Sequence, residues 1–158
     1  MLQRIQSLYL LFASIFFFIY WFFGLEWYKN GFKIIEENIS SAFIINSPSI
    51  ELLLNVTSNL PLIIVLISCL SIFLYKSRIR QILLCKISLY LSIYMCLFTI
   101  FYFYFTLTEL IDLMPSKLLE FLLYAAILNP FICTFLIYQA INSIKKDIEL
   151  INSLERIR

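Results

Sequence analysis

The sequence has no histidine, only two glycines in 158 residues, and four cysteines that lie far apart. Without histidine, a chain cannot form histidine-ligated haem, the usual zinc sites or a His-dependent catalytic triad. Loops that cradle phosphate need several glycines. Cys69, Cys85, Cys96 and Cys133 form no Cys-x-x-Cys pair, so they indicate small packing residues rather than a thiol oxidoreductase. We therefore expect a non-enzymatic protein without metal or cofactor.

Charge is scarce as well, and this scarcity indicates the class of protein. Hydrophobic residues make up 62% of the chain, aromatic residues 18% and charged residues 14%, whereas soluble domains have about a quarter of their residues charged. The composition is typical of an integral membrane protein. The net charge of +2 is too small to indicate a nucleic-acid partner. A chain of this length has room for one membrane domain and none for a separate catalytic domain.

Four stretches are apolar enough to cross a bilayer, for which a helix needs about 20 residues. They cover about residues 5–25, 56–75, 82–107 and 118–141. The first stretch lacks the small-residue cleavage site of a signal peptide, which favours a retained span. The connections between the later spans are short, and short connections place neighbouring helices antiparallel. We expect an all-α, up-and-down four-helix membrane bundle with an outer loop at 26–55 and a tail at 142–158.

The orientation follows from the distribution of lysine and arginine, which concentrate on the cytoplasmic side of membrane proteins. With both termini in the cytoplasm, nine of the twelve basic residues lie inside and seven of the ten acidic residues lie outside. No acidic residue is expected at mid-membrane, where a proton-coupled pump would need one. The nine basic residues are Arg4, Lys76, Arg78, Arg80, Lys86, Lys145, Lys146, Arg156 and Arg158.

Small residues at helical spacing predict which faces of the spans meet, because close contact between helices in lipid favours small side chains. The predicted contact faces are Cys85, Ser88, Ser92 and Cys96 in the third span, and Ala126, Asn129, Cys133 and Ala140 in the fourth. The aromatic stretch "FTIFYFYF" at 98–105 predicts lipid contact and an interfacial belt.

Asn129 and Pro130 are an unusual pair inside the fourth span. Pro130 cannot donate a hydrogen bond to the carbonyl group of Ala126, so the helix should kink there, and Asn129 can bond to freed backbone or to a neighbouring helix. A hinge or an ion-coordinating break of a transporter is the alternative interpretation. The absence of a nearby acidic residue favours the structural one.

The C-terminal stretch "NSIKKDIELINSLERIR" has the pattern of an amphipathic helix. Its apolar residues at helical spacing are Ile144, Ile148, Ile151 and Leu154. Such a helix can lie on the inner membrane surface, where Lys145 and Lys146 would meet anionic lipid, or it can dock on a partner protein. The sequence leaves both possibilities open, and either is compatible with a simple extension of the fourth span.

Three stretches resemble an uncharacterised family of Bacteroidota membrane proteins, domain of unknown function 4293. They are "MLQRIQSLYLLFA" at the start, "FLYKSRIRQILLCKIS" at 73–88 and "AINSIKKDIELINSLERIR" at the end. The resemblance implies a four-span, multi-pass protein of the bacterial inner membrane whose activity is unknown. It offers no catalytic residues.

These observations lead to two hypotheses of function. The first is a membrane subunit or adaptor whose basic cytoplasmic rim binds a partner protein or anionic headgroups, unless these charges only set the topology. The second is a small transporter or lipid-handling protein with a path along Asn129 and Pro130. Replacing Asn129 by leucine should be silent under the first hypothesis and damaging under the second. The proposed rim consists of Arg4, Lys76, Arg78, Arg80, Lys86, Lys145 and Lys146.

Overall fold

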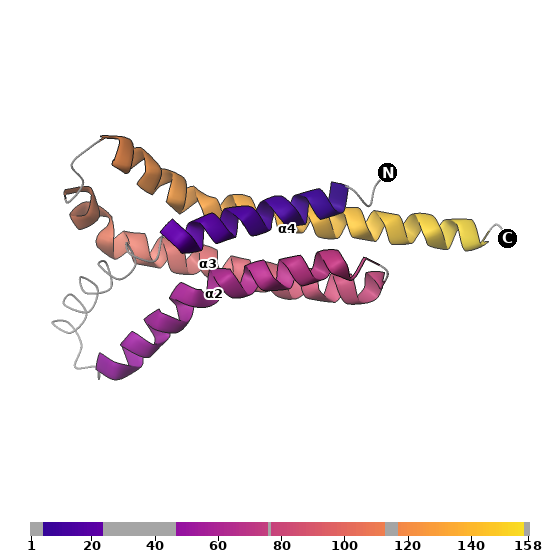
Figure 1. The fold of residues 1–158 in the computed structure, drawn as a ribbon, viewed down its shortest axis with the longest axis horizontal. Helices are drawn as coiled ribbons and strands as arrows, with labels where there is room; N and C mark the ends of the chain where they lie inside the picture. The colour runs from indigo at the N-terminus through magenta and orange to yellow at the C-terminus, as the bar shows by residue number, and fades with distance from the viewer. Residues whose placement is uncertain (1–4, 24–46, 76, 113–116, 157–158) are drawn as a thin grey trace.

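Four helices make up nearly all of the structure, a computed structural model that describes residues 5–23, 47–75, 77–112 and 117–156. Each helix is long and apolar enough to cross a membrane, so the prediction of an all-α protein with four candidate spans is confirmed. The helices are the N-terminal helix Ile5–Phe23, α2 (Ser47–Phe73), α3 (Arg78–Asp112) and α4 (Lys117–Arg156) (Figure 1).

Successive helices run in opposite directions, so the bundle is up and down (Figure 1). The turn between α2 and α3 lies at the same end as the two marked termini. Hydrogen bonds between side chains join the N-terminal helix to α2 through Trp21 and Asn59, and join α2 to α3 through Ser71 and Cys85. The packing of α4 against α3 and against the N-terminal helix completes the bundle.

The interior of the bundle is lined by the small residues that the sequence placed there. On α3 the predicted contact face is buried along its whole length, as Cys85, Ser88, Ser92 and Cys96. On α4, Cys133 and Ala140 are buried and Ala126 packs against the core. Small side chains let the helices approach closely, which explains why both faces could be recognised from spacing alone.

The prediction for the aromatic stretch 98–105 was wrong for three of its residues. Phe98, Tyr102 and Phe103 are buried in the core, whereas Phe101 and Tyr104 are exposed. Figure 1 shows that α2 and α4 diverge from each other toward the end of the bundle away from the termini. Wider spacing between helices needs larger side chains to fill it, so aromatic rings replace the serines and cysteines of the opposite half.

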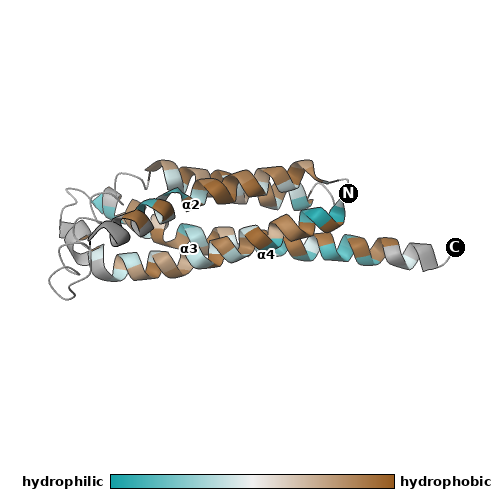
Figure 2. Ribbon diagram, turned by 90° about the horizontal axis from the view of Figure 1, so that it is seen from below, coloured by the Kyte–Doolittle hydropathy of each residue, from teal (hydrophilic) through white to brown (hydrophobic). Residues whose placement is uncertain are grey.

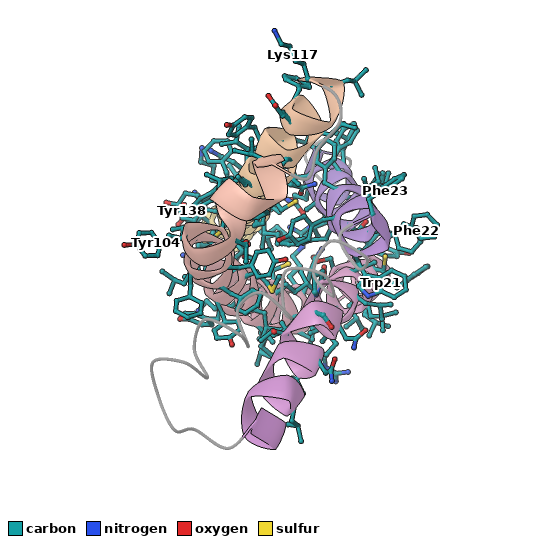
Figure 3. The ribbon with its side chains drawn as sticks, turned by 90° about the vertical axis from the view of Figure 1, so that its left-hand side faces the viewer. Trp21, Phe22, Phe23, Tyr104, Lys117 and Tyr138 are labelled. Atoms are coloured by element: carbon teal, nitrogen blue, oxygen red, sulfur yellow. The ribbon has the colours of Figure 1, made fainter. Side chains whose placement is uncertain are left out.

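The outer surface of the bundle is apolar, as lipid contact requires. Figure 2 shows hydrophobic residues along the packed helices, and hydrophilic residues near the N-terminus and in the last part of α4. Side chains at the periphery are directed away from the bundle, among them Phe22 and Phe23 on one side and Tyr104 and Tyr138 on another (Figure 3). Exposed tyrosines are typical of membrane interfaces.

Two helices extend beyond the spans expected from the sequence. α2 begins at Ser47, although the expected span begins at about residue 56. α4 runs without interruption to Arg156, so the amphipathic tail is an extension of the fourth helix. Each helix has a proline in its interior, Pro61 in α2 and Pro130 in α4, and both helices change direction along their length (Figure 1).

The contact between the N-terminal helix and α4 at Ala13 gives a test of the packing. Ala13 is fully buried, and its carbonyl oxygen lies 3.8 Å from the Sγ atom of Cys133. Replacing Ala13 by leucine should lower the free energy of unfolding by about 1–3 kcal/mol, because the added carbons have no space between the helices. Phe12→Leu, next to it on the exposed face, should change it by less than about 0.5 kcal/mol. Unfolding in mild detergent by titration with dodecyl sulfate measures both, and equal effects would contradict the packing described.

Candidate functional site

The apolar face of the α4 tail carries one charged residue. Ala140, Ile144, Asp147 and Ile148 follow one another at helical spacing on the face that packs against the bundle. Asp147 is only 6% exposed, although the charged lysines before it, Lys145 and Lys146, are exposed. Burying a carboxylate costs free energy unless a hydrogen-bond donor or a cation pairs with it. The contacts between Asp147 and its partners are therefore the strongest polar interaction at this end of the bundle.

Two other helices supply those partners. The side-chain amide of Gln6, in the first turns of the N-terminal helix, donates a hydrogen bond from Nε2 to Oδ2 of Asp147. The guanidinium of Arg78, at the start of α3, places Nη1 3.3 Å from the same oxygen. Gln6 is buried and the Arg78 side chain is 25% exposed. These three residues are called the Asp147 cluster below.

The Asp147 cluster satisfies the conditions for burying a charge. Arg78 neutralises the carboxylate, and Gln6 supplies a second donor to it. An ion pair of this kind gains little over apolar packing, but removing one partner leaves an uncompensated buried charge. The cluster therefore adds little net stability, but losing one of its partners would be costly.

The structure divides the predicted basic rim into two groups. Arg80 and Lys86 of α3 and Lys145 and Lys146 of α4 are exposed. Arg78 instead contacts Asp147 across the helix interface. Arg4 and Lys76 lie outside the described residues.

The Asn129 and Pro130 pair lies on the interior side of α4, apart from the Asp147 cluster. The Asn129 amide donates from Nδ2 to the backbone carbonyl of Phe16, 3.2 Å away on the N-terminal helix. The hydroxyl of Thr134 donates to the carbonyl of Pro130 at 2.7 Å. The bond from Asn129 to Phe16 is the interhelical hydrogen bond that was expected. The position of the kink stays a prediction. Within the described helices, no group of three metal-ligating side chains comes together.

Neither Gln6 nor Asp147 was predicted as a site residue from the sequence alone. A signal for Asp147 is present, because it interrupts the apolar stripe that includes Ile144 and Ile148. An acid on the buried face of an amphipathic helix calls for a cation from a neighbouring element. Gln6 has no comparable signal, because one glutamine at the start of an apolar helix is common.

The cluster is tested by a double-mutant cycle. Arg78→Gln should lower the free energy of unfolding by about 3 kcal/mol, because it leaves the Asp147 carboxylate buried without its cation. Adding Asp147→Asn should restore most of that loss, since the charge is then removed. Arg80→Gln, an equal charge change at an exposed position, should stay within about 0.5 kcal/mol of the parent protein. These changes in the free energy of unfolding are measured by unfolding in detergent. If the effects of Arg78→Gln and Asp147→Asn simply add, the two side chains are not paired.

Comparison with known proteins supports the resemblance carried by the ends of the chain and the turn between α2 and α3. No curated protein and no solved structure shows a significant match. A family model described as a domain of unknown function, DUF4293, matches residues 2–157. That match covers all four helices and the Asp147 cluster, and the chain therefore belongs to the DUF4293 family.

Proposed function

We propose that this protein is a non-enzymatic adaptor of the bacterial inner membrane that presents the end of α4 to a cytoplasmic protein partner. One observation carries the proposal. α4 continues as an unbroken helix past the ends of the other helices, so its last turns project from the bundle (Figure 1). A helix held clear of its own bundle is available to another molecule.

The direction of this projection favours a protein over the lipid surface. A helix that binds the membrane surface lies in the plane of the headgroups, at a steep angle to the spanning helices. The end of α4 instead continues along the line of the bundle in both ribbon views (Figures 1 and 2). Its exposed side chains then face the cytoplasm rather than the bilayer.

The exposed residues of this projection indicate the chemistry of the partner. Leu150 and Ile151 offer an apolar contact, and Lys145 and Lys146 precede them on the side nearer the membrane. Amphipathic helices bind partner proteins by laying apolar residues into a groove. The partner should therefore present an apolar groove with acidic side chains at its membrane-proximal end.

The cytoplasmic location of this end is part of the proposal. Arg80, Lys86, Lys145 and Lys146 are exposed toward the end of the bundle that also holds both termini. The excess of basic residues on cytoplasmic segments supports placing this end inside the cell.

A photoreactive amino acid at position 150 tests the docking. In cells, a benzoylphenylalanine in place of Leu150 should yield one discrete protein adduct. The same group in place of Tyr104, exposed at the far end, should yield none. Replacing Lys145 and Lys146 by glutamine should lower the adduct yield about fivefold if acidic groups of the partner face them. Adducts with lipid alone at position 150 would favour membrane-surface binding and contradict the proposal.

The orientation is tested separately by labelling a cysteine placed at Ser153, an exposed position near the end of α4. A membrane-impermeant maleimide added to intact spheroplasts should leave this cysteine unlabelled, and permeabilisation should expose it. Lys117→Cys, exposed at the opposite end, should be labelled in intact spheroplasts. The reverse pattern would place the α4 tail outside the cytoplasm.

A further inference from the structure

We propose that the Asp147 cluster is a latch that fixes the direction of the α4 tail and couples it to the packing of the N-terminal helix and α3. The proposal deepens the adaptor function and depends on it only for the consequence of the latch, which is control of docking. The existence of the latch rests on burial, on the contacts of the cluster and on its place along α4.

Asp147 lies at the boundary between the packed bundle and the projecting end of α4. Three residues earlier, Ile144 is 1% exposed, and three residues later, Leu150 is 53% exposed. Among the described residues of α4, Asp147 is the last buried side chain. Of the residues beyond it whose burial is described, only Ile148 packs in part against the core. Whatever holds Asp147 in place therefore sets the direction in which the following turns leave the bundle.

The contacts that hold Asp147 come from two other helices at once. Gln6 belongs to the N-terminal helix and Arg78 begins α3, and both contact the same carboxylate oxygen. A small shift of either helix changes these contacts. No residue of α2 is among the described partners of Asp147, so α2 is an internal reference for any effect of the latch.

The free energy of the Asp147 carboxylate depends on whether it is paired and whether it is buried. A carboxylate that leaves Arg78 while it stays buried carries the full cost of desolvation without compensation. Two states are therefore favourable. In the first, Asp147 is buried and paired with Arg78, and in the second, the part of α4 around Asp147 moves away from the bundle and the carboxylate reaches water. Intermediate positions cost more than either, which is the behaviour expected of a two-state element. Rearrangement of the bundle at this end would release the tail as a unit.

Hydrogen exchange of the full-length protein in detergent micelles tests the latch. Asp147→Asn and Arg78→Gln should each accelerate exchange of the amides at 144–151 by about tenfold or more. Exchange at 62–73 in α2 should stay within about twofold of the parent protein. Arg80→Gln is the control for loss of a positive charge. The reciprocal double variant, Arg78→Asp with Asp147→Arg, should restore slow hydrogen exchange, because it rebuilds the ion pair with its charges reversed.

Two results of this measurement would overturn the latch. Unchanged exchange at 144–151 in both single variants would show that the cluster does not hold the tail. Equal acceleration at 144–151 and at 62–73 would show a general loss of stability instead of a local release.

The coupling to docking is read from the photoreactive group at position 150 in the same variants. A lower yield of the protein adduct in Arg78→Gln and Asp147→Asn, with the yield recovered in the reciprocal variant, supports control of docking by the latch. An equal yield in all variants would overturn that control and leave the adaptor function standing. Absence of any protein adduct in the parent protein would overturn the adaptor function, while a latch seen by hydrogen exchange would stand.

Discussion

Inside a bilayer every backbone amide and carbonyl group must find its hydrogen-bond partner within the protein, and this constraint shapes the whole molecule. Helices meet it by themselves, and four long helices account for almost all of the described residues. Lipid, however, gives helices little hydrophobic reason to associate. What remains is close packing and weak polar contact, which explains why the core of this apolar protein contains serine, threonine and cysteine along α3.

Three hydroxyl groups share an arrangement in which the hydroxyl donates to the backbone of its own helix and accepts a hydrogen bond from another helix. Thr134 donates to the carbonyl of Pro130, which leaves its oxygen to accept from the thiol of Cys96. Ser71 likewise accepts from the thiol of Cys85 and donates to the carbonyl of Ser68. Thr99 accepts from the hydroxyl of Tyr20 and donates to the carbonyl of Met95. In each of these contacts the hydroxyl group already has a hydrogen-bond acceptor within its own helix. Separating the helices therefore leaves few polar atoms without a hydrogen-bond partner.

The Asp147 cluster follows a different rule, because its charges cannot be satisfied within one helix. Asp147 needs Arg78 from α3, and the pair is completed by Gln6 from the N-terminal helix. The cluster lies where the shared apolar core ends and where α4 continues alone. A charged contact at such a boundary fixes the direction of the projecting helix, which weak thiol and hydroxyl contacts within the bundle would not do. Asp147 thus lies where the proposed docking surface of α4 begins and is also the residue through which the proposed latch would control docking.

The sequence by itself determined the number of helices, their apolar character and the contact face formed by Cys85, Ser88, Ser92 and Cys96. Length, hydropathy and spacing along one helix are local properties, so no knowledge of the neighbouring helices was needed. Only the tertiary structure decided that Phe98 and Tyr102 fill the interior and that Arg78 contacts Asp147. The first depends on how far α2 and α4 diverge, and the second on contacts between helices distant in the sequence. Neither the spacing between helices nor their mutual rotation is encoded in the pattern of a single helix.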